Sequence, residues 1–239
     1  MKHINKNNSS HSIKNNPPSL NRMRFMHCVW SNFVKMEGYI YQDELVEQVF
    51  KDNQSHSDKR QVWKKCAVLN SMYSTNLMDA FRPTVEHICG IVNLTILIKE
   101  GDVSAVSQIE NVCVQRDTAK LYKRCTSFAS KYCHFHNPKA YPIFDRHVRR
   151  MLYYINKQHP FYDRLTLENM ESYHCFKDVV DAFIRKFLSN DSTSVSYKDF
   201  DRYIWTWAKM LLGDEDFKRV INYQGVFPSE IPEDLRLYR

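Results

Sequence analysis

The stretch SFASKYCHFHNPKAYPIFDRHV, residues 127–148, joins a short apolar segment with helical spacing to a Pro-Ile-Phe-Asp corner. The helix is expected to end at Asn137-Pro138, because the residue before a proline is disfavoured in helical conformation. Residues 116–150 contain nine Lys or Arg and two acidic residues, a net of +7 that equals the formal charge of the whole chain. Such a zone attracts polyanions such as nucleic acid. The carboxylate of Asp145 inside it needs a separate explanation.

The composition favours a mainly helical protein. The chain has 239 residues, of which 43% are hydrophobic, and only five are glycine. Long runs of alternating apolar residues are scarce, which argues against a sandwich or barrel. We therefore predict an all-α fold, as one domain or two closely packed helical halves.

Cysteine usage and the amino end indicate a reducing compartment. The seven cysteines are scattered and form no C-x-x-C pair, so neither a disulfide framework nor a zinc ribbon is expected. The first residues lack the apolar core of a signal peptide, and no segment approaches the length of a membrane span. The sequence thus predicts a soluble cytoplasmic protein with no membrane partner and no metal site.

Apolar spacing divides the chain into a polar arm and a helical domain. Residues 1–19 are rich in Asn, Ser and Lys and are expected to form a disordered basic arm, followed by a domain over residues 20–239. The spacing predicts helices over residues 20–36, 43–50, 62–70, 77–99, 103–112, 116–125, 128–136, 146–156, 172–188 and 197–212. A tight turn at Thr126-Ser127 is expected to separate the helices over 116–125 and 128–136. The tail from residue 226 on is expected to be irregular.

Asp145 has two compatible roles. It can cap the helix over residues 146–156, since Asp is a preferred residue at that position. A carboxylate held at a helix start is also suited to stabilising a cationic transition state or orienting a water molecule.

Three short blocks resemble the helix-hairpin-helix DNA glycosylases. Pro142-Ile-Phe-Asp-Arg-His-Val148 is similar to the corner that places the catalytic aspartate in that family. Residues 69–80, LNSMYSTNLMDA, resemble its polar turn between two helices, and residues 197–207, YKDFDRYIWTW, resemble a segment of divergent bacterial members related to 8-oxoguanine glycosylases. The resemblance implies two helical subdomains with a degenerate helix-hairpin-helix near residues 116–150 and an active site in the cleft between the subdomains.

The hairpin departs from the family pattern. Where the family has Leu-Pro-Gly-x-Gly, this chain has Cys125-Thr-Ser-Phe-Ala-Ser130. Hydroxyls of Thr126, Ser127 and Ser130 are expected to replace some backbone amides that contact a DNA phosphate. The four closely spaced cysteines of one family branch are absent, so no iron-sulfur cluster is expected.

The resemblance assigns further residues to the site. Asp145 is the expected catalytic residue. Lys131, 14 positions before it, is either a phosphate contact, the favoured alternative, or the Schiff-base nucleophile of a bifunctional enzyme. Thr75 and Asn76 are expected to occupy the space left by an extruded base. The expected phosphate contacts, whose alternative is a solvated helical face, are Lys123, Arg124, Arg146, Arg149 and Arg150.

Pocket residues are less well defined by the pattern. His134 and His136 alternate on a short helix and should face different ways, so a metal pair is not expected. His136 is a candidate for the base pocket, although a core histidine is the favoured alternative. Of two nearby tryptophans, Trp207 is the candidate for the pocket and Trp205 for the core, and the sequence does not separate the two roles.

The function that the resemblance implies is hydrolytic excision of a modified base from double-stranded DNA by a monomeric, monofunctional enzyme without cofactors. The favoured substrate is a bulky phage-modified pyrimidine, such as glucosylated hydroxymethylcytosine, in antiphage defence; the alternative is an oxidised purine in base-excision repair. A rival hypothesis is a catalytically inactive DNA-binding protein with a structural or regulatory role. A third is an RNA-binding helical protein.

Overall fold

The computed structural model describes residues 17–37, 39–116, 119–189 and 194–211. The chain divides into two compact units. Ile40–Phe144 form the inserted unit, and the chain on either side of it, Met1–Tyr39 with Asp145–Arg239, forms the flanking unit. Both are built mainly of helices, which confirms the predicted all-α class.

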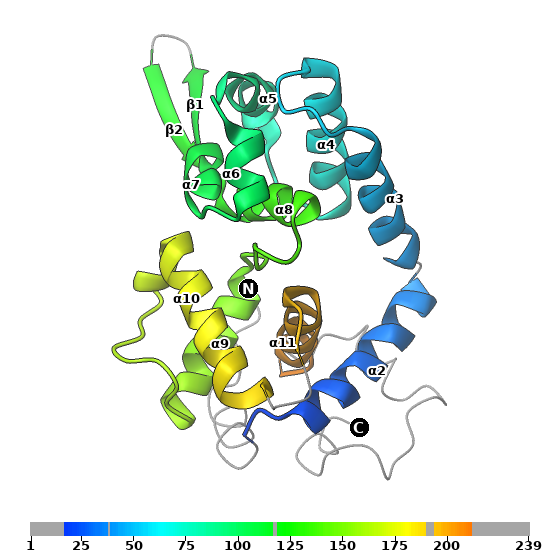
Figure 1. Cartoon of the computed structure of the whole chain (residues 1–239), viewed down its shortest axis with the longest axis vertical. Coiled ribbons are helices and arrows are strands. Elements are labelled where there is room, and N and C mark those ends of the chain that lie inside the picture. The colour runs from blue at the N-terminus through cyan, green and yellow to red at the C-terminus, as the bar shows by residue number, and fades with distance from the viewer. Residues whose placement is uncertain (1–16, 38, 117–118, 190–193, 212–239) are drawn as a thin grey trace. The chain divides into compact units, whose positions relative to one another are not determined.

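The inserted unit is arranged around one buried helix. Its elements are α3 (Tyr39–Asp52), α4 (Lys59–Met72), η1 (Met78–Ala80), α5 (Phe81–Gly90), α6 (Leu94–Glu100), α7 (Ser104–Glu110), β1 (Asn111–Arg116), β2 (Ala119–Arg124) and α8 (Thr126–His136). The last of these, α8, packs against α4, α6 and α7 (Figure 1). From Thr126 to His134 only Ser127 is not buried. A helix that is buried on nearly all sides belongs to the core, which explains why polar side chains on α8 lie inside the protein.

Local sequence signals fix the ends of several helices in this unit. Asp58 caps α4, and its carboxylate accepts hydrogen bonds from the amides of Arg60 at 2.8 Å and Gln61 at 3.3 Å. Gly101 ends α6 with φ of 77°, a left-handed conformation that glycine adopts without strain. A Cβ atom at this position would lie 2.8 Å from the Cβ of Ala140, so glycine is also required sterically.

A β-hairpin precedes α8. The antiparallel strands β1 and β2 pair from Asn111 with Arg124 to Arg116 with Ala119. Val112 and Val114 are buried, whereas the alternating residues Asn111 and Cys113 are exposed, as expected for a half-buried strand. The hairpin contacts α5, α7 and η1 through β1.

The flanking unit contains α2 (Leu20–Glu37), α9 (Arg146–Gln158), η2 (Asn169–Glu171), α10 (Tyr173–Phe183), the π-helical turn η3 (Ile184–Leu188) and α11 (Tyr197–Leu211). Helix α11 packs against α2 and α9, and α10 contacts α9. Val148, Met151, Leu152 and Ile155 form the buried stripe of α9 at helical spacing.

Two predicted helices are wrong. Within the predicted helix over 116–125, Arg116 ends β1 and Ala119–Arg124 form β2, and the predicted Thr126-Ser127 turn is instead the first turn of α8. The predicted helix over 77–99 is divided into η1, α5 and α6, with a break at Ile91–Asn93. Asn93 has φ of 59°, which a continuous right-handed helix cannot contain.

Other predictions agree with the structure. Ser196 and Asp199 cap α11 reciprocally: the Asp199 amide donates to Ser196 Oγ at 3.1 Å, and this hydroxyl donates to the Asp199 carboxylate at 2.6 Å. The predicted basic arm lies outside the described residues up to residue 16, and so does the predicted irregular tail from residue 226. Within the described part of the chain, no helix is both long and apolar enough to span a membrane.

Candidate functional site

The Pro142–Phe144 corner is tied to α8 by two hydrogen bonds. The Phe144 amide donates to Ser130 Oγ at 3.0 Å, and His134 Nδ1 lies 2.7 Å from the Tyr141 carbonyl. The Tyr141 hydroxyl in turn donates to the carbonyls of Leu97 at 3.0 Å and Asp102 at 2.9 Å. The backbone that leads to Asp145 is therefore fixed within the inserted unit by buried polar contacts.

Asp145 begins the second segment of the flanking unit as the N-cap of α9. Its Oδ1 accepts from the amides of His147 at 2.6 Å and Val148 at 3.3 Å, which confirms the predicted cap. The side chain is half-buried. Burial lowers the pKa of His147, and the charge of Asp145 opposes that effect. The catalytic role of Asp145 remains a prediction.

Lys131 lies inside the protein rather than on its surface. Its residue is 5% exposed, and its Nζ donates to Ser127 Oγ at 2.8 Å and reaches the Ser127 carbonyl at 3.5 Å. A phosphate contact needs an accessible ammonium group, so this placement argues against the favoured expectation for Lys131.

The hydroxyls predicted to replace hairpin amides are used internally. Thr126 Oγ1 donates to the buried Glu110 carboxylate at 2.5 Å, and Arg124 pairs with the same carboxylate at 3.2 Å. Ser130 is fully buried, and its Oγ donates to the Ser127 carbonyl at 3.1 Å. These contacts join the base of the hairpin to α8, and they argue against phosphate contacts by Thr126 and Ser130.

The turn over residues 74–78 has an unusual backbone. Ser74, Asn76 and Met78 have φ of 47°, 55° and 46°, and they are three of the five non-glycine residues with positive φ in the described chain. Residues other than glycine rarely adopt this conformation, at a cost of about 1–3 kcal/mol each, and it is concentrated at functional sites. The turn is therefore held by its surroundings.

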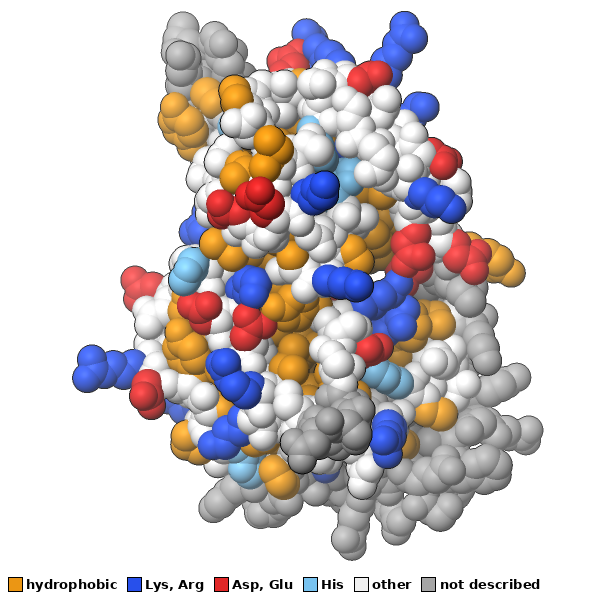
Figure 2. Space-filling model, in the orientation of Figure 1, with side chains coloured by type: hydrophobic (Ala, Val, Ile, Leu, Met, Phe, Trp, Pro, Cys, Tyr) orange, Lys and Arg blue, Asp and Glu red, His pale blue; other side chains and the backbone are white. Residues whose placement is uncertain are grey.

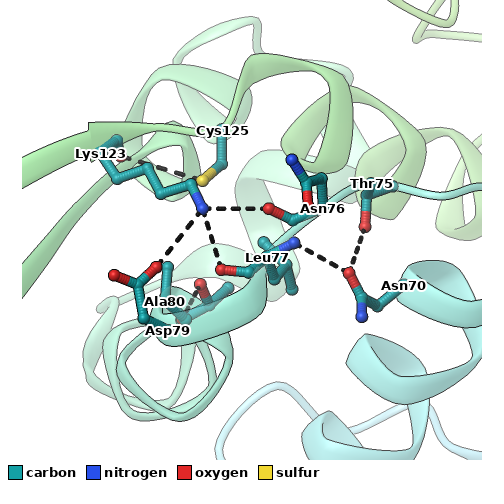
Figure 3. Close-up of polar contacts among 9 residues, drawn as sticks. Asn70, Thr75, Asn76, Leu77, Asp79, Ala80, Lys123 and Cys125 are labelled. Atoms are coloured by element: carbon teal, nitrogen blue, oxygen red, sulfur yellow. Dashed lines mark hydrogen bonds and ion pairs between the residues drawn. The ribbon is translucent and has the colours of Figure 1, made fainter.

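Two side chains hold this turn, as Figure 3 shows. Lys123 on β2 donates to the carbonyls of Asn76 and Leu77, each at 3.0 Å, and lies 3.6 Å from the Asp79 carboxylate. Asn70 Oδ1 accepts from the Leu77 amide at 2.9 Å and from Thr75 Oγ1 at 3.3 Å. These contacts assign Lys123 to stabilising the turn and argue against a phosphate contact. The side chain of Asn76, in contrast, is exposed.

The three predicted arginines at the start of α9 differ in their surroundings. Arg149 pairs with Glu171 at 2.7 Å and donates to the Leu167 carbonyl at 3.4 Å. Arg146 and Arg150 are exposed. On the face shown in Figure 2, Lys and Arg side chains are interspersed with Asp and Glu side chains.

A buried lysine that sequence reasoning missed lies at the other end of α8. Lys65 is 0% exposed, and its Nζ donates to the Ser55 carbonyl at 2.9 Å and lies 3.1 Å from His136 Nε2. The ammonium group also lies 4.9 Å from the centre of the Tyr132 ring. His56 completes this Lys65 cluster, with Nδ1 3.0 Å from the Tyr132 hydroxyl.

The titratable groups of the Lys65 cluster have strongly shifted pKa values. Burial lowers the pKa of Lys65 to about 7. Burial, with the charge of Lys65, lowers the pKa of His56 to about 4 and that of His136 to about 2. Burial also raises the pKa of the Cys66 thiol to about 12. His136, a predicted pocket residue, is thus part of a buried polar cluster, and it contacts both Lys65 and the ring of His56.

The remaining predicted pocket residue lies in the core. Trp207 is 0% exposed, stacks on Tyr203 with ring centres 5.7 Å apart, and lies beneath the guanidinium group of Arg22. Trp205 is half-buried, so the structure separates the two tryptophans that the sequence does not. No three His, Cys, Asp or Glu side chains in the described segments are grouped so that they could hold a metal ion.

Comparison with known proteins identifies similar sequences. The family model HI_0787_N, described as an N-terminal domain, matches residues 25–140, a region that includes Lys65, the 74–78 turn and Lys131 but not Asp145. An uncharacterized protein of Haemophilus influenzae (strain KW20/Rd) is 34% identical over 153 residues, which cover 64% of this chain and 66% of the relative. The chain thus spans about 66% of the length of that relative. No solved structure matches the chain significantly.

Proposed function

We propose that the protein is a DNA glycosylase that extrudes a modified base from duplex DNA and hydrolyses its N-glycosidic bond. The observation that carries the proposal is the setting of Asp145. Two amides fix its carboxylate at the start of α9, and the chain before it is tied to α8 through Ser130. Catalytic groups need such fixed positions, since small displacements lower the rate strongly.

Asp145 supplies the chemistry of this reaction. As the bond from C1′ to the base nitrogen lengthens, the sugar becomes positively charged, and a nearby carboxylate stabilises that charge. A water oxygen then bonds to C1′, the electrons of the broken bond leave with the base, and Asp145 accepts the water proton. Protonation of the departing base completes the hydrolysis and leaves an abasic site.

Two features of the chain are suited to contacts with the duplex. Arg146 and Arg150 are exposed on the helix that Asp145 begins, and they are suited to phosphate contacts. A base inside a duplex cannot be reached, so the nucleotide must be extruded, and the 74–78 turn is suited to contacting the vacated stack. Lys131 is buried beside Ser127 and is assigned a supporting role, with water as the nucleophile.

The favoured substrate is a bulky phage-modified pyrimidine, with an oxidised purine as the alternative. The enzyme acts as a monomer in the cytoplasm on double-stranded DNA. In the first case its role is antiphage defence, and in the second it is repair.

The test uses duplexes that each carry one modified base, incubated with the protein and then treated with alkali to break abasic sites. The key variant is Asp145→Asn. Asparagine is also a good N-cap, so folding and DNA binding are retained, while excision falls about a thousandfold or more. Asp58→Asn is the matched control, because the Asp58 carboxylate caps α4 by accepting from the amides two and three residues on, as Asp145 does for α9. It leaves excision unchanged.

Other outcomes separate the alternatives. Unaltered excision by Asp145→Asn contradicts the proposed mechanism. Strand breaks without alkali, together with a borohydride-trapped complex that Lys131→Met abolishes, would make Lys131 the nucleophile of a bifunctional enzyme. Duplex binding without excision of any base in the set supports the inactive DNA-binding protein. Competition by single-stranded RNA at matched salt supports an RNA-binding role.

A further inference from the structure

Trp63 is an aromatic side chain on the solvent side of α4. It is 44% exposed, whereas Val62 and Lys65 on the same helix are 0% exposed. Its ring contacts that of Phe81, the first residue of α5, with centres 5.0 Å apart and planes at 73°. An edge-to-face pair of this kind is a preferred aromatic geometry, and it fixes the orientation of the indole ring. The inserted unit therefore holds an aromatic ring in a defined position at its surface.

Basic side chains surround Trp63 on α4. Lys59, Arg60 and Lys64 are exposed, and all three lie within about one helical turn of Trp63. Lys59 pairs with Glu86 of α5 at 3.1 Å. Arg60 and Lys64, in contrast, form no ion pair and no side-chain hydrogen bond with any residue that the structure describes. These two cations are therefore available to a partner.

The carboxylates that reach these cations are already engaged. Glu86 lies 3.1 Å from Lys59 Nζ and 3.0 Å from Arg82 Nε, so it is shared between two cations. Asp58 accepts hydrogen bonds from backbone amides as the N-cap of α4. Together with the two remaining cations of α4, four basic and two acidic side chains give this surface a positive excess. The surface thus attracts anions.

This combination favours single-stranded nucleic acid as the partner. Proteins that bind single strands stack bases on aromatic rings and bind the phosphates with basic side chains beside them. Tryptophan is also common in interfaces between proteins, but charged residues are depleted at the centres of those interfaces. Around Trp63 the charges border the ring itself. Bases inside a duplex are already stacked on their neighbours and cannot reach it.

We propose that the surface formed by Arg60, Trp63 and Lys64 binds single-stranded DNA, with one base stacked on the indole ring and phosphates on the two cations. The surface goes beyond the proposed function, because it requires neither Asp145 nor excision. Only the choice of DNA over RNA rests on that function. All three residues lie within the region that matches the family model.

The test measures the binding of a short fluorescein-labelled oligothymidine to the full chain by fluorescence anisotropy. Wild-type protein is expected to bind it. Trp63→Ala weakens binding about tenfold, since the stacking of one base on an aromatic ring contributes on that scale. Trp63→Phe retains most of the affinity, because a ring is still present. Arg60→Gln and Lys64→Gln each make the dependence of log affinity on log salt less steep by about 0.7, the value expected for one phosphate contact on a single strand.

An exposed aromatic residue without basic neighbours supplies the matched control. Tyr41 is 73% exposed in the same unit, but the exposed side chains one turn further along α3 are Glu44 and Leu45. Tyr41→Ala is therefore expected to leave binding unchanged. Circular dichroism and thermal unfolding establish that each variant is folded. If Trp63→Ala is unstable because it loses the contact with Phe81, the two glutamine variants at exposed positions still decide the question.

The outcomes separate this inference from the proposed function. If wild type does not bind oligothymidine, or if Trp63→Ala binds it as wild type does, the surface is overturned and the glycosylase proposal stands. If binding depends on Trp63 although wild type excises no base in the set of modified duplexes, the surface stands and the enzymatic proposal fails. Tighter binding of oligouridine at matched salt overturns the assignment to DNA. If Trp63→Ala instead changes only the sedimentation of the free protein, the surface is an interface between copies of the chain and the inference is wrong.

Discussion

Two buried lysines of the inserted unit, Lys131 and Lys65, have different surroundings along α8. Lys131 lies on its first turns beside Ser127, next in sequence to the serine that binds the Phe144 amide. Lys65 packs against the last turns, beside Tyr132 and His136, and is sealed from solvent. The chain that follows α8 from the Lys131 region continues to Asp145. The Lys65 cluster contains none of the exposed residues that are proposed to contact DNA.

The difference teaches that burial of an amine does not by itself identify a functional residue. Perturbed groups concentrate at active sites, but structural clusters also perturb pKa values. The Lys65 amine is surrounded by a carbonyl, an imidazole and aromatic rings, which hold it in place without giving it access to substrate. The Lys131 amine has a hydroxyl partner on a helix that fixes the corner.

The largest expected difference between the two regions is in activity. Lys131→Met should lower excision about a hundredfold, since it removes the amine that organises the serine-rich end of α8, and a small misplacement of a catalytic group costs on that scale. Lys65→Met should change excision by less than about threefold. Single-turnover excision of whichever modified base is accepted measures both rates.

Equal losses in the two variants would contradict this division of roles. The melting temperature of each variant must then be compared with that of wild type, because a folding defect lowers activity in both. A rate loss in Lys131→Met without loss of DNA binding would separate a catalytic contribution from a phosphate contact.

The second expected difference is in the pH dependence of stability. The pKa of Lys65 is 10.5 in the unfolded chain and about 7 in the folded protein, so between these values the unfolded chain holds a proton that the folded protein has released. The free energy of unfolding contributed by this group therefore rises with pH in that window and is lost as pH falls toward 7. From about pH 7 to 8.5 the rise is roughly 2 kcal/mol.

Urea unfolding of wild type and Lys65→Met at several pH values measures this effect. The difference between their free energies of unfolding reports Lys65 together with the pKa changes of His56, His136 and Cys66, because the charge of Lys65 contributes to the shifts of all three. A difference that is independent of pH would show that the amine is protonated throughout.

The positions of most helices could be predicted from apolar spacing and caps. Asp145 and Ser196 are capping residues in both the sequence and the structure, because a cap depends on neighbours within one turn. The hairpin was missed although Val112 and Val114 alternate with exposed residues. The basic residues of β2 resemble a polar helical face. A strand is favoured instead because β2 pairs with β1, whose residues lie on the other side of the turn.

The candidate site was predictable only in part. Lys65 lies among Val62, Cys66 and Leu69, which are all buried, so its spacing placed a lysine on the apolar face of α4. That signal indicates burial but not the partners, since His56 and His136 come from other parts of the chain. The strain at Met78 left no trace in the sequence, because it depends on Lys123, which is distant in the chain.

The smallest expected effect tests how firmly the Lys131 region holds the corner. Ser130→Ala removes the acceptor of the Phe144 amide and should lower the free energy of unfolding by about 1–2 kcal/mol, since a buried amide loses its partner. Thr84→Val is the matched control: Thr84 is equally buried, but its hydroxyl donates only within its own helical turn, to the Ala80 carbonyl at 2.6 Å. Its cost should be smaller. If Ser130→Ala lowers excision more than its stability loss accounts for, the serine positions the chain that carries Asp145; if excision is unchanged, the corner is held by the Tyr141 contacts instead.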